Sequence, residues 1–288
     1  MTPQEYCQEK AANSGSSFYY SFLSLPVQKR EAITAVYAFC REVDDIVDAH
    51  GDPQIKSTKL TWWHDEIDNL YESIPQHPIT KALKPVIEHF SLPKEYFSEI
   101  IDGMQMDLHQ HRYASFKDLS LYCYRVASVV GLISAEIFGY QDRQTLKYAN
   151  DLGIAFQLTN IMRDVYDDFK NDCIYISQDE LEKFGVTEHD LMTQNNNEAF
   201  KNLMQYQAER ANSYYDKAFS QLPASDRYTQ RAGIIMSAIY RALLNEIITD
   251  DYQVLLHRVR LSSARKIWIA WRTKRNENKI NKKYLKHA

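Results

Sequence analysis

The sequence predicts an all-α fold in a single domain covering residues 1–288. Two observations carry this prediction. The chain has only eight glycines and eight prolines, with no proline between Pro93 and Pro223, whereas a β-rich or α/β chain of this length would normally contain more turn residues. Apolar residues also recur every three to four positions through most of the chain, which is the period of an amphipathic helix.

Breaks and caps divide the first half of the chain into helices. Apolar side chains at helical spacing predict a helix over residues 29–49, after Pro26 and before Gly51-Asp52-Pro53. Further helices are predicted over residues 57–73, 79–90 and 93–111. Ser115 and Asp118 have capping-box spacing and predict a helix that runs to about Phe138, with Gly139 as its stop.

The second half continues the same pattern. A long helix is predicted over residues 143–170, followed by a candidate active-site loop at 169–178. The pairs Ser177 with Glu180 and Thr187 with Asp190 predict two short capped helices, the first ending at Gly185. Two more amphipathic helices are predicted over residues 196–220 and 227–249. No repeat, low-complexity tract or inter-domain linker is evident.

The composition narrows the class of protein. Hydrophobic residues at 44% and charged residues at 25% are ordinary for a soluble domain. The four cysteines form no CxxC pair, no secretory signal is recognised, and no uninterrupted apolar run reaches the roughly 18–20 residues of a membrane span. We therefore expect a cytoplasmic protein with reduced thiols and no nucleic-acid partner.

Two acidic clusters stand at helical spacing about 115 residues apart in the chain. Asp44 and Asp48 are four residues apart, and Asn160, Asp164 and Asp168 are spaced in the same way, so each set lies on one helix face. Both sets lie in apolar helical patterns, where unpaired like charges are unfavourable. Carboxylate and amide oxygens suit Mg²⁺, which leaves its remaining positions to water and phosphate oxygens. The alternative is that each cluster is a solvated helix face.

Other metal and cofactor sites fit the sequence poorly. A di-iron bundle needs Glu-x-x-His on a helix, and no histidine here has a glutamate three residues before it. No cysteine and histidine combine at zinc-ligand spacing, and neither GxGxxG nor a P-loop occurs. A reaction that does suit metal clusters in an apolar bundle is ionisation of an allylic diphosphate. The metal improves the leaving group, and a dry cavity, here supplied with 20 Tyr, 12 Phe and 4 Trp, protects the carbocation.

Four motifs carry a resemblance to a known family. These are Ser16-Ser17-Phe18-Tyr19-Tyr20-Ser21-Phe22, the segment from Tyr37 to Asp48 with Asp44-Asp45-Ile46-Val47-Asp48, the segment from Tyr122 to Gly131, and Gln157-Leu158-Thr159-Asn160-Ile161-Met162-Arg163-Asp164 followed by Asp167-Asp168. Together they resemble the squalene and phytoene synthases, the head-to-head trans-isoprenyl diphosphate synthases. The variant Arg125-Val126-Ala127-Ser128 looks most like the bacterial presqualene diphosphate synthases of hopanoid biosynthesis.

The resemblance implies a fold and a set of site residues. The fold would be an isoprenoid-synthase-type helical bundle around a deep central cavity. The implied Mg²⁺ ligands, for which Mn²⁺ is a candidate substitute, are Asp44, Asp48, Asn160, Asp164 and Asp168. Tyr122 would be catalytic together with these aspartates, by assisting proton removal or steadying the cation. The implied substrate-binding residues are Ser17, Phe18, Arg41, Gln157, Arg163, Tyr175, Tyr240 and Arg258.

Each assignment has a plainer structural alternative. Tyr240 and Phe18 could be core aromatics, Arg163 could be an ion-pair partner of Asp167, and Asp45 points away from Asp44 on the helix. The chain also departs from the family at Cys173, where an arginine often precedes the Ile-Tyr of the loop after the second motif. We expect Lys170 as a candidate replacement for that phosphate contact.

The resemblance implies a reaction between two molecules of farnesyl diphosphate that gives presqualene diphosphate and inorganic diphosphate, with NADPH not expected as a cofactor. The alternatives are squalene, dehydrosqualene or phytoene synthesis, and a catalytically silent helical binding protein. A downstream pathway enzyme is a candidate partner.

The C-terminus is strongly basic. Residues 265–288 contain nine Lys or Arg and one Glu, whereas the whole chain has a net charge of −4. We expect a basic tail at about 272–288. One hypothesis is peripheral contact with an anionic membrane surface at the inner face of the membrane, because Ile267, Trp268 and Trp271 adjoin the charges. The alternative is a solvated tail whose tryptophans pack on the bundle.

Overall fold

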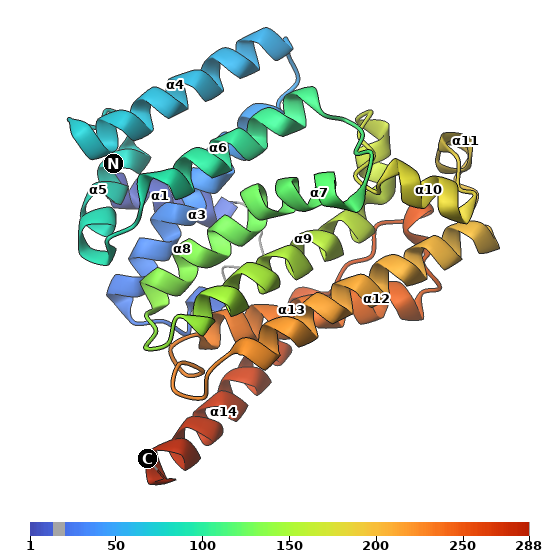
Figure 1. Ribbon diagram of the computed structural model, residues 1–288. Coiled ribbons are helices and arrows are strands. Elements are labelled where there is room, and N and C mark those ends of the chain that lie inside the picture. Colours follow the sequence, from blue (N-terminus) through green and yellow to red (C-terminus); the bar gives the residue numbers. More distant parts are fainter. Residues whose placement is uncertain (14–20, 288) are drawn as a thin grey trace.

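The computed structural model describes residues 1–13 and 21–287, and these residues form an α-helical bundle without a strand element (Figure 1). The α-helices are α1 (Pro3–Asn13), α3 (Val27–Asp48), α4 (Pro53–Glu72), α5 (Pro78–Phe90), α6 (Lys94–His109), α7 (Phe116–Cys123), α8 (Val129–Phe138), α9 (Gln144–Lys170), α10 (Gln178–Phe184), α11 (Glu188–Met192), α12 (Glu198–Gln221), α13 (Arg231–Thr249) and α14 (Ser263–His287). The all-α prediction is confirmed. Helix α1 was not predicted.

Local capping explains where the helices begin. The capping boxes predicted at Ser115 and Thr187 both form, through Asp118 and Asp190. Helix α4 begins earlier than predicted because the Asp52 side chain accepts a hydrogen bond from the backbone of Gln54, and Pro53 fits the first turn. The box predicted at Ser177 is wrong. Helix α10 begins there, but Glu180 turns inward to Arg210 and Gln207 instead of capping the helix.

The helix predicted from Ser115 to Phe138 contains one turn of π-helix, η1 (Tyr124–Ser128), between α7 and α8. Glycines allow the backbones around η1 to approach closely. A Cβ at Gly153 of α9 would lie 2.6 Å from the Cα of Ser128, and a Cβ at Gly131 would lie 2.5 Å from the carbonyl oxygen of Ala149. The π turn and α8 are therefore seated directly on α9, with no room for side chains at these two points.

Helix α9 lies at the centre of the bundle and contacts η1, α8, α12 and α13 (Figure 1). One apolar cluster surrounds it, with α12, α13 and the loop after α9 contributing, and a second cluster is built by α3, α4, α5, α6 and α8. The two clusters make up most of the described core, and Asp107 of α6 lies within electrostatic reach of acidic residues on both α3 and α9. The packing thus brings together two motifs that are far apart in the chain.

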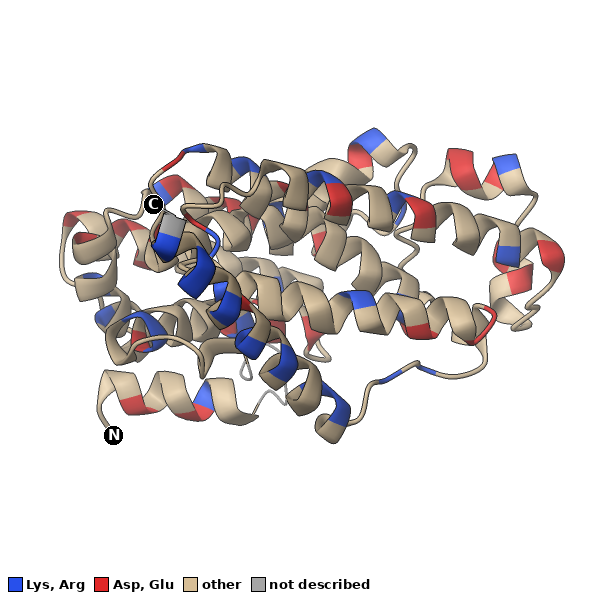
Figure 2. Cartoon of the chain, turned by 90° about the horizontal axis from the view of Figure 1, so that it is seen from below, with Lys and Arg blue, Asp and Glu red and all other residues tan. Residues whose placement is uncertain are grey.

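The C-terminal residues expected as a tail are part of helix α14, which packs on α13 (Figure 2). Ile269 and Ala270 pack against the core, and Glu277 is 2% exposed and forms an ion pair with Arg227, with contacts of 2.7 and 2.8 Å. Most side chains from residue 272 onward are exposed, as expected for a solvated segment, but the segment is helical and the buried Glu277 ties it to the bundle.

Two helical stretches, Phe116–Phe138 and Arg231–Thr249, have the length and mean hydropathy of a membrane span. The most apolar window of each is 50% and 56% buried inside the protein, respectively, which is also the pattern of a core helix. By length and composition alone these stretches are weak evidence for a span.

Candidate active site

The first acidic stripe lies at the end of α3. The carboxylates of Asp44, Asp45 and Asp48 can each place an oxygen within 4.8 Å of the others. Burial, followed by the charge of Asp48, raises the pKa of Asp44 to about 6, and burial likewise raises the pKa of Asp48. Arg41, one turn earlier, donates to Asp44 at 2.6 Å and also contacts Asp45. Arg41 thus serves Asp44 and Asp45, and Asp48 has no ion pair among the described residues.

Asp45 has a different environment from its two neighbours. Besides Arg41, it pairs with Lys10 of α1 at 2.7 Å, and Lys10 also reaches Glu42 at 2.8 Å. Asp45 therefore connects α1 to α3 as part of a surface ion-pair network. This agrees with the expectation that it points away from Asp44, although it stays within reach of the same cluster.

The second acidic stripe lies on α9. Asp168 is crowded by acids: burial, followed by the charges of Asp164 and Asp107, raises its pKa to about 8. Asn160 is one turn before Asp164, and its Oδ1 is buried with no hydrogen-bond partner among the described residues. A buried amide oxygen without a donor is unfavourable and is suited to receive a cation.

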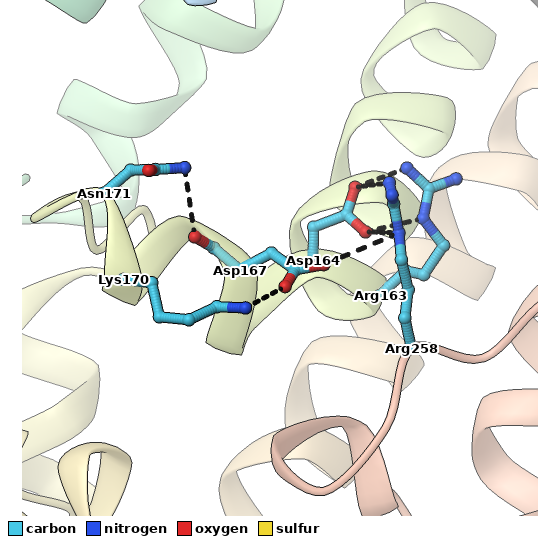
Figure 3. Close-up of polar contacts among 6 residues, drawn as sticks. All are labelled: Arg163, Asp164, Asp167, Lys170, Asn171 and Arg258. Atoms are coloured by element: carbon cyan, nitrogen blue, oxygen red, sulfur yellow. Dashed lines mark hydrogen bonds and ion pairs between the residues drawn. The ribbon is translucent and has the colours of Figure 1, made fainter. Parts of the chain in front are cut away.

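Two arginines clamp Asp164 (Figure 3). Arg163 donates its Nε to Asp164 at 2.8 Å and makes a second contact through Nη2. Arg258, from the segment between η2 (Gln253–Leu255) and α14, donates to the same carboxylate at 2.7 and 3.0 Å. The alternative that Arg163 pairs with Asp167 is wrong in this structure, because Asp167 instead pairs with Lys170 at 2.7 Å.

An apolar cavity of about 170 Å³ begins at this stripe. Gln157 and Asn160 line its polar end, and the aromatic rings of Phe156 and Tyr148 line its wall, together with residues of η1, α8 and α13. Tyr240 of α13 stands close by: its ring lies 4.8 Å from that of Phe156, and its hydroxyl is hydrogen-bonded to Asn160. Asn160 therefore lies where the apolar cavity adjoins oxygen atoms that are suited to bind a metal ion.

Asp107 of α6 was missed by sequence analysis and connects the two stripes. It accepts hydrogen bonds from Tyr175 at 2.8 Å and Tyr122 at 3.0 Å. Burial raises its pKa to about 7 despite these donors, and the charges of Asp44 and Asp48 add to the shift. Since Asp107 in turn acts on Asp168, it lies within electrostatic reach of both stripes. A lone aspartate near a helix end gave no signal in the sequence.

The tyrosines on Asp107 form a stack. The rings of Tyr122 and Tyr175 lie 5.0 Å apart at 22°, and the Tyr113 ring contacts both, at 5.9 Å from Tyr175 and 5.8 Å from Tyr122. Burial, followed by the charge of Asp107, raises the pKa of Tyr122 well above its usual value. Tyr122 is therefore a neutral phenol with a fixed orientation at physiological pH.

The candidate loop after α9 carries Tyr175 into the site. Its backbone is held by the segment before α7, where Ile174 donates to His111 at 2.9 Å. Arg112 of that segment donates to the backbone of Asp172 at 2.5 Å, next to Cys173, where the family often has an arginine. Lys170, the expected replacement, is half-exposed on the Asp167 side. Arg112 is a cation near this loop that sequence analysis did not consider.

The structure thus brings most of the predicted site residues together. Tyr122 and Tyr175 meet on Asp107, whereas Asn160, Arg163, Asp164, Tyr240 and Arg258 form one connected cluster. Gln157 lines the cavity, and Arg41 stays with the first stripe. Ser17 and Phe18 lie outside the described residues, although Ser21 and Phe22, which follow them, line the cavity.

The comparisons with known proteins agree with this geometry. The sequence profile of the squalene/phytoene synthase family matches residues 11–265. A 15-cis-phytoene synthase from Synechococcus elongatus is 33% identical over 278 residues, covering 91% of this chain and 89% of that protein. The chloroplastic phytoene synthase 1 of Arabidopsis thaliana is also 33% identical, over 91% of this chain, which spans only 63% of the length of that relative.

Solved structures give the same answer. A dehydrosqualene synthase superposes with a TM-score of 0.83 at 27% identity, over 99% of this chain and 97% of its own. A squalene synthase from Alicyclobacillus acidocaldarius gives a TM-score of 0.78 at 26% identity, over 87% and 94%. The matched fold, the family profile and relatives above 30% identity show that this chain belongs to the squalene/phytoene synthase family.

Proposed function

We propose that the protein is a prenyltransferase that condenses two prenyl diphosphates head to head and releases inorganic diphosphate. The observation that carries this proposal is that two arginines and an apolar cavity adjoin the α9 carboxylate stripe at Asn160 and Asp164, while Asp107 lies within electrostatic reach of both carboxylate stripes. Such a site can hold a diphosphate at its polar end and a hydrocarbon chain at the other. Family membership supports the same reaction class.

Mg²⁺ would be held by Asp44 and Asp48 on α3 and by Asn160, Asp164 and Asp168 on α9. The residues fit a divalent cation because burial and, next, neighbouring carboxylates raise the pKa values of Asp44 and Asp168, and because Asn160 Oδ1 is a buried acceptor without a donor among the described residues. When bound, the metal would neutralise the diphosphate and make it a better leaving group.

Arginines would hold the diphosphate as it departs. Arg163 and Arg258 already converge on one carboxylate with bidentate contacts, which is the geometry in which guanidinium groups also bind phosphate. In the structure they neutralise Asp164. Substrate binding would therefore exchange these pairs for contacts to phosphate oxygens while the metal takes over Asp164.

The rest of the site would handle the carbocation. The C1–O bond of one substrate breaks, its C1 bonds to the 2,3-double bond of the second, and loss of one proton closes a cyclopropane. Tyr122, fixed by Asp107, presents a neutral phenol that would steady the cation or relay that proton. The apolar wall excludes water. At about 170 Å³ the cavity is below the ~300–1,000 Å³ of typical ligand pockets, so side chains must move to admit two prenyl chains.

We infer that the substrates are two farnesyl diphosphates and that the product is presqualene diphosphate, without use of NADPH. The Arg125-Val126-Ala127-Ser128 variant supports this choice, because it forms the π turn and Val126 and Ala127 line the cavity. The second candidate is a phytoene-type condensation of two C20 substrates, favoured by the phytoene synthases among the relatives.

Product analysis distinguishes these candidates. The protein is incubated with C15 and C20 diphosphates and Mg²⁺, with and without NADPH, and the products are identified by mass. Presqualene diphosphate from the C15 substrate under both conditions is the expected result. Phytoene from the C20 substrate supports the second candidate, squalene with NADPH or dehydrosqualene without it refutes arrest at presqualene diphosphate, and no diphosphate release from either substrate contradicts the reaction class.

A further inference from the structure

Helix α14 has an inner and an outer face. The inner face carries Lys266, Ile269, Ala270, Thr273 and Glu277, all less exposed than their neighbours and spaced three to four residues apart. Glu277 is 2% exposed and is held by two contacts to Arg227. Because this ion pair fixes the rotation of α14, the same outer face is always presented to solvent.

The outer face is an amphipathic stripe. It begins with two exposed tryptophans and continues as a ladder of cations, at three- and four-residue spacing. In order, the residues of this outer stripe are Trp268, Trp271, Arg275, Lys279, Lys282 and Lys286. Trp268 and Trp271 are 53% and 56% exposed, and Ile267 beside them is 52% exposed. The alternative that the tryptophans pack on the bundle is therefore wrong.

The cations of this stripe are free to act on a partner. Arg272 stands over the Trp268 ring at 5.2 Å and Arg275 over the Trp271 ring at 5.5 Å, so the first cations are stacked next to the apolar surface. Within residues 1–13 and 21–287, no ion pair involves Lys279, Lys282 or Lys286. Glu277 is the only acid among residues 265–288 and is buried, and the ribbon of α14 is marked by repeated Lys and Arg positions in Figure 2.

We infer that the outer stripe of α14 docks reversibly on an anionic lipid bilayer. Tryptophan favours the membrane–water interface, and each Lys or Arg close to an anionic surface adds attraction that salt weakens. A helix face with tryptophans at one end and a row of cations along the rest can contact such a surface side-on, through the rings at the interface and the cations at the headgroups. A nucleic-acid duplex would use the cations but would leave the two tryptophans without an apolar partner, whereas single-stranded RNA can stack bases on aromatic rings and is therefore included in the test.

The position of the outer stripe next to the candidate active site indicates what docking would achieve, and this point rests on the proposed function. Helix α14 follows directly after the segment that carries Arg258 into the candidate active site. Prenyl diphosphates and a C30 product have long apolar chains that partition into lipid. Docking through α14 would therefore hold the rim of the candidate active site close to the lipid bilayer into which its substrates partition.

The test uses the full chain and sedimentation with vesicles of phosphatidylcholine, alone or mixed with phosphatidylglycerol. Truncation near Lys274 is unsuitable because it removes Glu277 and leaves Arg227 unpaired. Binding to the mixed vesicles only, weakened by salt, is expected. Changing Trp268 and Trp271 together to Ser should lower the partition coefficient about tenfold or more, whereas Trp62→Ser on α4, where Trp62 is 45% exposed, should not.

Charge reversal gives the second comparison. A triple change of Lys279, Lys282 and Lys286 to Glu should lower binding roughly 100-fold or more. The matched control changes three exposed lysines elsewhere, Lys59, Lys81 and Lys117, with the same total charge. Circular dichroism shows that each variant is folded. Equal binding by the two triple variants, no binding of the wild type at low salt, or binding to RNA but not to vesicles would overturn the proposal. The vesicle assay contains no substrate and therefore does not depend on the proposed reaction. Asp44→Ala should accordingly bind vesicles like the wild type, whether or not the proposed reaction is correct.

Discussion

Carboxylates lie close together in both acidic stripes, but the two stripes differ in exposure and in the cations that pair with them. The stripe on α3 is partly exposed, with Asp44 38% exposed, and one arginine serves two of its carboxylates. The stripe on α9 is deeper, with the Asp164 side chain 15% exposed and clamped by Arg163 and Arg258. Asp48 of the α3 stripe therefore has no ion pair among the described residues, whereas in the α9 stripe arginines occupy the carboxylate that a metal would use. This difference predicts opposite responses to equivalent substitutions.

Removal of one candidate metal ligand from either stripe should have the largest effect on catalysis. Asp44→Ala and Asp164→Ala should each lower the rate of diphosphate release about 100-fold or more, because each removes charge that assists the leaving group. Steady-state release at saturating Mg²⁺ and prenyl diphosphate measures the effect. Near-normal release by Asp44→Ala would remove the α3 stripe from the metal site.

The same two variants should differ in stability without metal. Asp164→Ala leaves Arg163, whose side chain is 20% exposed, without its carboxylate and should cost on the order of 2 kcal/mol. Asp44→Ala relieves repulsion with Asp48 and should stabilise the fold by about 0.5 kcal/mol. Chemical unfolding in EDTA measures both changes, and equal signs for the two variants would contradict the contrast between the stripes.

Asp107 tests the connection between the stripes. Asp107→Asn keeps the size of the side chain but removes a carboxylate that accepts from two tyrosines, so kcat should fall about 10- to 100-fold with little change in KM. Tyr113→Phe is the matched control, because Tyr113 is in the same stack and its hydroxyl has no partner among the described residues. Similar losses in both variants would assign Asp107 a packing role only.

The last prediction concerns the pH dependence of stability. The pKa of Asp168 is about 8 in the folded protein and near its ordinary value of 3.8 in the unfolded chain, so the folded state binds more protons between these values. Stability without metal should therefore fall as the pH rises from about 4 to 8. Asp168→Asn should make this fall shallower, as measured by thermal unfolding in EDTA across this range. An unchanged slope would mean that Asp168 ionises normally.

Much of the fold followed from local rules. The boxes at Ser115 and Thr187 and the stop at Gly185 are set by nearest neighbours along the chain, and the structure confirms them. The predicted bounds of the longer helices agree with the structure to within about four residues. The box at Ser177 failed because Glu180 finds a stronger partner, Arg210, thirty residues away. The π turn also escaped prediction, because inserting one residue into a helix barely alters its apolar period.

The site was predictable where residues repeat on one face and not where contacts cross the bundle. Helical spacing alone pointed to the candidate metal ligands Asp44, Asp48, Asn160, Asp164 and Asp168. Asp107 becomes meaningful only when folding brings α6 against Tyr122 and the loop after α9. The inner face of α14 has helical spacing at Ile269, Thr273 and Glu277, but the high positive charge of residues 265–288 made the segment look like a solvated tail.

The central claim is that the two stripes form one metal–diphosphate site, and calorimetric titration of Mg²⁺ with inorganic diphosphate tests it most directly. The wild type should bind diphosphate in a Mg²⁺-dependent way, and both Asp44→Asn and Asp168→Asn should lose at least about tenfold in affinity, since ligands from α3 and α9 would act together. Thermal unfolding without metal controls for folding. Unchanged Mg²⁺-dependent diphosphate binding by either variant would show that its stripe does not belong to the site.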